Sequence, residues 1–292
     1  WKSRRMRDER LFAVLAIPRD FQRDVLRGAP ARVELLYNTQ TMTAGNLVAR
    51  DIRSAAATLS AGVGMQRGIA PALVVETHAM FNPGLDYLRF LGLPLVVALL
   101  HIAMVVVAVD IAGRELREGS AAQWLGAAGG QVAAALVGKT APYLAFYALI
   151  GWFALAALVR GFGIAPAVSL WVWFAAWCLM VVASFGFGLF LVVLTANLRL
   201  AVSTASLVVS PAFAFSGLTF PLVAMHGLAK AWALLLPLGH FLAVQTAVLQ
   251  VGTSARMLWP HLVVLTGFAL LPWLLLPRWR RIMGDPADWG RT

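Results

Sequence analysis

Apolar residues dominate the chain from residue 90 onward, whereas polar and apolar residues alternate over short distances before that point. A helix that crosses a lipid bilayer needs about 17–20 largely apolar residues. Five runs reach this length, at residues 91–112, 137–159, 165–194, 200–218 and 258–276. The pattern therefore predicts an α-helical polytopic membrane protein with five spans in this sequence.

Residues 221–251 are also apolar, but Pro221, Gly227, Pro237 and Gly239 interrupt the run. Proline removes a backbone donor and ends or kinks a helix. Non-helical backbone at membrane depth is tolerated only where protein covers it. We therefore expect this outer segment (residues 221–251) to form a broken re-entrant pair of short helices rather than a sixth span.

The first 89 residues show shorter periods. Brief apolar runs bounded by turn residues predict three strands, at 11–17, 31–38 and 73–81. A helix over 19–27 should end at Gly28, and a second helix over 41–62 should end at Gly62. The second helix is expected to bury a stripe at helical spacing: Leu47, Ile52, Ala55, Ala56 and Leu59. The result is a β-α-β-α-β unit.

Composition supports a division between residues 1–89 and 90–292. The chain is 60% hydrophobic and 13% charged, whereas soluble domains average roughly 25% charged residues. Residues 1–89 hold 13 of the 24 Lys and Arg residues and 8 of the 13 Asp and Glu residues. We predict an α/β domain followed by a transmembrane domain. The net charge of +11 does not indicate nucleic-acid binding, since no basic face with interleaved aromatic residues is present.

The distribution of Lys and Arg between short loops predicts the orientation, because cytoplasmic loops carry the excess. With five spans, one side holds Arg114, Arg117, Lys139, Arg199, Arg278, Arg280, Arg281 and Arg291, and the other holds Arg160, Lys230 and Arg256. The richer side is expected to be cytoplasmic, which places residues 1–89 outside the cytoplasm. The chain begins at Trp1 with no apolar signal sequence. We therefore expect a transmembrane helix to precede it.

One short connector, GRELREGSAAQWLG (residues 113–126), is rich in charge. Read as a helix, it pairs Arg114 with Glu118 and continues into an apolar stripe that includes Trp124. This pattern is typical of an amphipathic helix lying on the membrane surface, against which a cytosolic partner can push. The alternative is a solvated loop held by local ion pairs. Asp110, near the end of the preceding span, is also spaced to pair with Arg114.

Candidate catalytic chemistry is sparse. The sequence GKT at 138–140 lacks the glycine of a nucleotide-binding loop at position 133, which is alanine, and we expect Lys139 to reach toward the membrane interface instead. Cys178 is the single cysteine. His101 lies within a span, where an ionisable group is a functional candidate. A neutral imidazole hydrogen-bonded to a neighbour is the alternative.

Several motifs occur in an order that resembles a known family. They are the strand–helix element AVLAIPRDF (13–21), the connector GRELREGSAAQWL (113–125), GKTAPY (138–143), FSGLTFP (215–221) and LPLGHF (236–241). Together they resemble the permease subunit of type-2 ABC exporters, in the group with a large extracytoplasmic domain after the first span. The sequence departs from the family's usual Arg-Glu-x-Glu-x-Gly-Thr pattern in RELREGS, and it lacks the first span.

The resemblance implies a permease of the bacterial cytoplasmic (inner) membrane that moves an amphiphilic or hydrophobic substrate outward. This chain would bind no cofactor, and ATP and Mg would be bound by a separate cytosolic ABC ATPase. It further implies a homodimer or a paired permease, contact with membrane lipid, and leaves open a periplasmic adaptor protein. The coupling contact with the ATPase would involve Arg114, Glu115, Arg117, Glu118 and Trp124.

The outer segment would supply an outer gate, formed by Pro221, Leu236, Leu238, Gly239, His240 and Phe241. The alternative is a passive plug that only seals the helix bundle. A different class of function is also open, namely a membrane-anchored sensor or an integral membrane enzyme with an extracytoplasmic ligand-binding domain. An enzyme should show polar residues that converge at one membrane interface, and the sequence places few ionisable residues within its spans.

Overall fold

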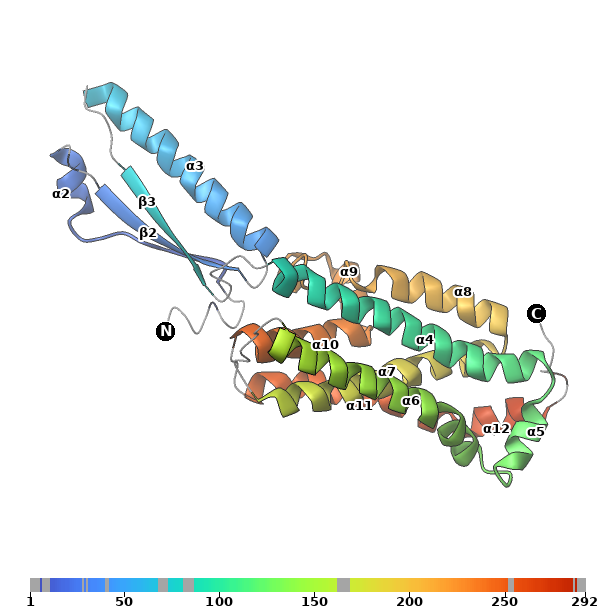
Figure 1. Cartoon of the computed structure of the whole chain (residues 1–292). Helices are drawn as coiled ribbons and strands as arrows, with labels where there is room; N and C mark the ends of the chain where they lie inside the picture. Colours follow the sequence, from blue (N-terminus) through green and yellow to red (C-terminus); the bar gives the residue numbers. More distant parts are fainter. Residues whose placement is uncertain are drawn as a thin grey trace. The chain divides into compact units, whose positions relative to one another are not determined.

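The chain forms two compact units in a computed structural model (Figure 1), one of Trp1–Gly92 with Thr219–Ala224 and one of Leu93–Leu218 with Met225–Thr292. We call them the N-terminal unit and the membrane unit. The structure describes residues 6, 11–27, 29, 31–39, 42–67, 73–80, 87–161, 169–251, 255–285 and 287. The predicted helix end at Gly28 and the predicted span start at 165–168 lie outside these residues.

The N-terminal unit contains a three-stranded sheet in the order β1-β2-β3. Strand β1 (Ala13–Ala16) pairs antiparallel with β2 (Ala31–Asn38), and β2 pairs in parallel with β3 (Leu73–Met80). The short helix α2 (Phe21–Leu26) connects the first two strands, and α3 (Met42–Arg67) connects the last two. The three predicted strands are confirmed, as is their alternation with helices.

Helix α3 differs from the prediction in its end and in its buried face. It continues past Gly62 to Arg67, so glycine does not end it. Ala49 is fully buried against Leu35 and Tyr37 of β2, with Ile52 packed beside them. Leu47 and Leu59 of the predicted stripe are exposed, as is Ala55. The long run of alanine and serine leaves several possible faces, and the sheet selects one of them.

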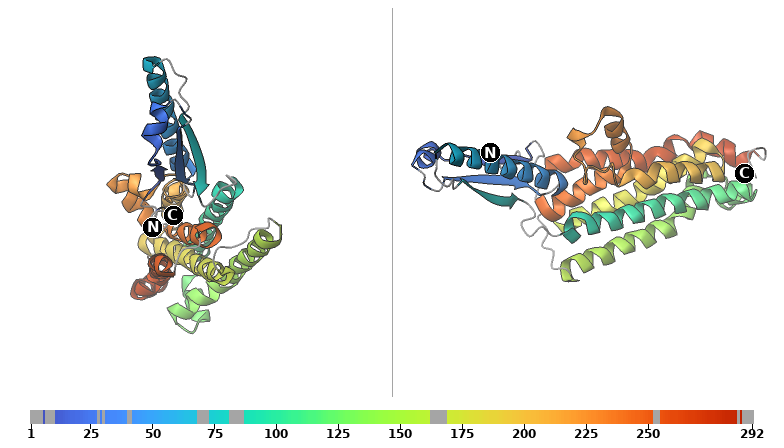
Figure 2. Two further views of the ribbon diagram at one scale, coloured as in Figure 1. Left: turned by 90° about the vertical axis from the view of Figure 1, so that its left-hand side faces the viewer. Right: turned by 90° about the horizontal axis from the view of Figure 1, so that it is seen from above.

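The membrane unit is a bundle of long helices (Figures 1 and 2). Among the residues that the structure describes, four helical segments are long and apolar enough to cross a membrane: Phe90–Arg117, Val132–Gly161, Leu170–Thr195 and Met257–Gly284. They correspond to α4 (Leu93–Arg117), α6 (Val132–Ala156), α7 (Leu170–Thr195) and α11 (Ala255–Leu274) with α12 (Leu276–Gly284). Four of the five predicted spans therefore correspond to long helices.

The predicted span over 200–218 is not a continuous helix. Helix α8 (Leu198–Val209) is followed by a 3-10 turn over Ser210–Ala212 and by further turns. Twelve residues at 1.5 Å each reach only about 18 Å. The α-helix ends at Val209, two residues before Pro211, which has no backbone N–H to donate. Apolar character alone overestimated the length of this helix.

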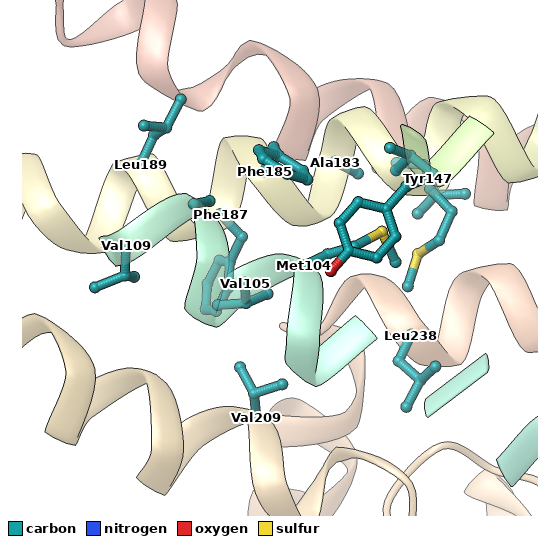
Figure 3. Packing of buried hydrophobic residues seen from close by; sticks show 14 of the residues in the cluster. Met104, Val105, Val109, Tyr147, Ala183, Phe185, Phe187, Leu189, Val209 and Leu238 are labelled. Atoms are coloured by element: carbon teal, nitrogen blue, oxygen red, sulfur yellow. The ribbon is translucent and has the colours of Figure 1, made fainter. Parts of the chain in front are cut away.

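Helix α7 lies at the centre of the membrane unit and packs against α4, α6, α10 (Pro237–Thr246) and α11. Figure 3 shows part of the resulting core, with Met104 and Val109 from α4, Tyr147 from α6 and Phe185 from α7. Tyr147 meets Phe185 edge to face, with ring centroids 5.9 Å apart. Like the core of a soluble helix bundle, the membrane unit buries bulky side chains around a central helix.

Two glycines allow neighbouring helices to approach α7 closely. A Cβ at Gly188 would lie 2.7 Å from the Cβ of Ala108 and 2.7 Å from the Val105 carbonyl oxygen, both on α4. A Cβ at Gly186 would overlap the Phe268 carbonyl oxygen of α11. Small residues at such contacts are what brings membrane helices together, since lipid supplies no hydrophobic driving force between them.

We predict that Gly188→Leu destabilises the membrane unit by about 1–3 kcal/mol or more, because the added side chain has no space against α4. Thermal unfolding of the purified protein in detergent should show a lower midpoint. Gly267→Leu is the matched control, since nothing lies within 4 Å of a Cβ at this exposed position on α11. Equal midpoints for the two variants would contradict the close packing of α4 and α7.

Candidate coupling site at one end of the membrane unit

The charged connector is divided between two helices rather than forming one. Residues 114–117 are the last turn of α4, and the surface helix α5 covers only Ala121–Ala127. The chain turns at Gly119 with φ 71°, a backbone conformation that glycine adopts without strain. The prediction of one amphipathic helix through this segment is wrong, because Gly119 separates its charged half from its apolar half.

Glu115 faces the interior of this junction. Its carboxylate accepts hydrogen bonds from the Lys139 ammonium of α6 and from the Ser120 hydroxyl just before α5. The Glu115 and Lys139 side chains are only 19% and 26% exposed. This ion pair ties the end of α4 to the start of α6 across the connector, so the geometry favours a positioning role for Glu115 over direct contact with a partner.

Trp124 fixes α5 onto the same junction. Its indole N–H donates to the Ala135 carbonyl oxygen of α6 at 3.1 Å, and the Lys139 Nζ lies 5.1 Å from its ring centroid. Trp279 of α12 contacts Trp124 edge to face, with ring centroids 6.5 Å apart. Helices shorter than about 12–15 residues are marginal on their own. The orientation of α5 therefore depends on these tertiary contacts.

The remaining charged residues of the predicted coupling contact lie on the surface. Arg114 pairs with Asp110, one helical turn earlier, at 2.7 Å. The predicted Asp110–Arg114 pair is therefore confirmed, and Arg114 forms it in place of the pair predicted with Glu118. Arg117 and Glu118 are 3.6 Å apart. The side chains of Arg114, Arg117 and Glu118 are about half exposed, at 54%, 49% and 54%. They form a charged face beside the buried Glu115–Trp124 cluster.

Sequence reasoning missed three residues of this site. Lys139 was expected to reach the interface, and instead pairs with Glu115. Trp279 is completely buried, and Arg278 donates to the carbonyl oxygens of Val193 and Leu194 at the end of α7. The available signal was the density of Trp and Arg in PRWRR (277–281), which was interpreted only as a basic tail.

These contacts place three segments at one end of the membrane unit, namely the α4–α6 connector, the α7–α8 connection and the C-terminal helix α12. The α4–α6 connector meets α12 through Trp124 and Trp279, and α12 meets the α7–α8 connection through Arg278. Figure 1 shows α5 and α12 at this end. The three were predicted to share a side of the membrane because they share an excess of Lys and Arg.

The outer segment contains two short helices, as predicted. They are α9 (Gly227–Leu234) and α10, which continues as a π-helical turn to Val251. The two meet at an angle of 81°. Pro237 occupies the first turn of α10, where its missing N–H leaves no broken hydrogen bond.

The predicted gate residues of α10 point into the protein. Leu236, Leu238 and Phe241 are at most 2% exposed. The Phe241 ring packs edge to face against Trp173 and Trp177 of α7, at 6.0 and 5.6 Å between centroids. A Cβ at Gly239 would lie 3.3 Å from the Ser216 carbonyl oxygen. Within one copy these side chains seal the bundle, which favours the packing alternative for them.

The other two predicted gate residues are Pro221 and His240, of which only His240 lies on α10. Pro221 belongs to Thr219–Ala224, which is grouped with the N-terminal unit. His240 is 7% exposed, and its Nε2–H donates to the Leu234 carbonyl oxygen at the end of α9, at 3.1 Å. Its Nδ1 lies 3.1 Å from the Nδ1 of His261 on α11. Since the carbonyl fixes the proton on Nε2, a neutral His240 accepts from His261.

His101 is completely buried within α4, and its Nδ1 lies 2.9 Å from the Ser184 hydroxyl oxygen of α7. Ser184 itself donates to the Met180 carbonyl oxygen at 2.8 Å, so the imidazole is the donor in the first contact. This is the hydrogen-bonded arrangement expected of a structural histidine. The Nε2 atom has no partner among the residues that the structure describes.

We predict that Glu115→Gln destabilises the protein by about 1–3 kcal/mol, since it leaves the partly buried Lys139 ammonium without its counter-ion. Glu115→Gln combined with Lys139→Gln should recover most of this loss. Thermal unfolding of the single and double variants measures both effects. Glu118→Gln should cost less than about 1 kcal/mol, because its ion pair is exposed. A larger effect at Glu118 than at Glu115 would contradict this assignment.

Phe241→Ala should lower stability by about 3–5 kcal/mol, because it leaves a cavity against Trp173 and Trp177. Leu235→Ala, at a neighbouring residue that is 64% exposed, should change stability little. Unfolding midpoints in detergent compare the two. A Phe241→Ala variant as stable as the parent protein would show that this ring serves the transport path rather than the core.

Most of both units takes part in the family comparison, which ends at the start of α12. A family model described as an ABC-2 family transporter protein matches residues 3–276. No curated protein and no solved structure shows a significant match to the chain. The match covers both units and all of the motifs on which the resemblance was based. The chain therefore belongs to the ABC-2 family of transporter proteins, a family of membrane-embedded transport subunits.

Proposed function

We propose that this protein is the permease of an ATP-driven exporter, and that it moves an amphiphilic or hydrophobic substrate out of the cytoplasm. Family membership supports pairing with an ABC ATPase in general. The observation that carries the proposal is the junction of α4, α5 and α6, where a charged face surrounds a short helix held by buried contacts. A partner that pushes on α5 would move the ends of two long helices together.

The division of charge at this junction fits a docking surface. Arg114, Arg117 and Glu118 offer both signs of charge to a partner, while Glu115 and Trp124 hold the surface in place. Charges at the rim of an interface govern the rate and specificity of association more than its affinity. The ATPase would therefore recognise the exposed residues and transmit force through the buried ones.

The scarcity of charged residues inside the helix bundle supports an amphiphilic or hydrophobic substrate. Among the described residues of α4 and α6, Asp110, Arg114 and Lys139 lie near the same helix ends. The Nδ1 of His101 and the Nε2 of His240 have hydrogen-bond partners, and the Nε2 of His101 has none among the described residues. A polar or ionic cargo would need charged groups along its path, and in α4 and α6 the charged residues stay near the helix ends. The surface that α9 offers to cargo, lipid or a second copy is largely apolar, with Leu228, Leu234 and Leu235 exposed beside a single exposed cation, Lys230.

The remaining assignments follow from the same orientation. The end that carries α5 and α12 would face the cytoplasm of a bacterial cell, and the N-terminal unit would lie on the far side of the inner membrane. Two permease copies, or a pair of related permeases, would form the path between them. The outer segment would then close that path as a sealed cap, with α9 rather than the buried α10 residues at its surface.

The docking role predicts that exchanging the charges of Arg117 and Glu118 (Arg117→Glu with Glu118→Arg) abolishes coupling to the ATPase. The exchange preserves net charge and the local ion pair, so the permease should fold and insert normally. Co-purification of the ATPase and the ATP hydrolysis of the complex in proteoliposomes measure the effect.

Arg160→Glu is the control for the docking test, because Arg160 is an exposed cation just beyond the opposite end of α6. It should leave ATPase binding and hydrolysis unchanged. Full binding and hydrolysis in the charge-exchanged variant would reject this face as the docking surface.

A further inference from the structure

Helix α12 connects three parts of the membrane unit that are far apart in sequence. It follows α11 after a break at Leu275 and runs for nine residues, with Trp279, Ile282 and Met283 buried. It contacts α5, α6 and α7. A short basic helix at the end of the last span could hold its charges near the membrane surface without burying any side chain. The burial of three side chains of α12 therefore indicates a further structural role.

Arg278 binds the open end of α7. The last four carbonyl groups of a helix have no partner within it. Here the chain leaves α7 through Ala196 in the left-handed conformation, φ 49°, whose N–H bonds to the Val192 carbonyl oxygen. The Arg278 guanidinium donates to the next two carbonyl oxygens, those of Val193 at 2.7 Å and Leu194 at 3.0 Å. A cation at a helix C-terminus is also favoured by the helix dipole.

Trp279, the next residue, binds α5. Its ring is 0% exposed and meets Trp124 at an interplanar angle of 84°. Trp124 is itself held by the Ala135 carbonyl and the Lys139 ammonium. Adjacent residues on one rigid turn therefore hold the surface helix and the end of the central helix. A displacement of α5 cannot leave α12 unaffected without breaking the Trp124–Trp279 contact.

We propose that α12 transmits the displacement of α5 to the α7–α8 connection, with Trp279 and Arg278 as the positioning residues. This rests on the proposed docking of an ATPase at α5. A second route exists, since a Cβ at Gly113 of α4 would lie 2.7 Å from the Leu198 Cδ1 of α8. The two routes differ in one respect, because only the first requires Arg278 and Trp279.

The test uses two single-cysteine reporters in a Cys178→Ser background. Ala127→Cys reports on exposed α5, and Leu200→Cys reports on α8, where Leu200 is 54% exposed. The permease is reconstituted with its ATPase in proteoliposomes, and maleimide labelling rates are compared with and without ADP–vanadate. We expect both reporters to change rate in the parent protein.

In Arg278→Gln and in Trp279→Leu, the reporter on α5 should keep its nucleotide response, because Trp124 keeps its contacts with the Ala135 carbonyl and the Lys139 ammonium. The reporter on α8 should lose most of its response. The double variant should lose no more than either single variant, since both residues serve one linkage. Arg280→Gln and Arg281→Gln are matched controls, being exposed arginines of the same helix, and should respond like the parent. Size-exclusion profiles and thermal midpoints identify any variant that fails to fold. Arg278→Lys then replaces Arg278→Gln, because one ammonium keeps the charge without bridging both carbonyls.

The outcomes separate two failures. If the α5 reporter does not respond in the parent protein, the proposed docking at α5 is wrong, and the proposed transmission through α12 is rejected as well. If the α5 reporter responds and the α8 reporter responds fully in folded Arg278 and Trp279 variants, docking stands and α12 is not the route. Retention of the α5 response with loss at α8, in these variants and not in the controls, supports the proposal.

Discussion

Within a bilayer every backbone N–H and C=O must find a partner inside the protein, because lipid offers none. The membrane unit meets this requirement most visibly where its helices end or break. Arg278 satisfies two carbonyls at the end of α7, the Asn197 side chain accepts from the Leu200 N–H at the start of α8, and His240 donates to the Leu234 carbonyl between α9 and α10. Each of these side chains therefore fixes a turn that would be costly without it.

The same requirement explains how closely the helices pack. Helices that satisfy their own backbones attract one another through van der Waals contact, which is strongest where side chains are small. Gly186 and Gly188 bring α11 and α4 against α7, and the aromatic residues Trp177 and Phe241 fill the space toward α10. Close packing around α7 leaves less room for rearrangement at the centre than at the helix ends. The exposed charges of the coupling site and the angle between α9 and α10 lie at such ends.

The coupling site shows how one connector can serve two purposes. Alternate residues of the last turn of α4 point in different directions, so Glu115 reaches Lys139 while Arg114 and Arg117 remain at the surface. The buried charges hold the junction together, and the exposed ones are those assigned to docking in the proposed function. This division gives a physical reason for the unusual density of charge in a sequence that is otherwise so apolar.

Local pattern in the sequence determined the three strands, the long apolar helices, the broken outer segment and the Asp110–Arg114 pair. Periodicity, proline and glycine act over a few residues, so these features could be predicted without knowing their distant partners. Tertiary structure decided the rest, including the buried face of α3, the early end of α8, the inward position of Glu115 and Phe241, and the contacts of Arg278 and Trp279. A sequence shows that a residue is charged or aromatic, but which helix stands opposite it is a property of the packed bundle. That neighbour decides whether the residue is a docking surface, a core element or a link between helices.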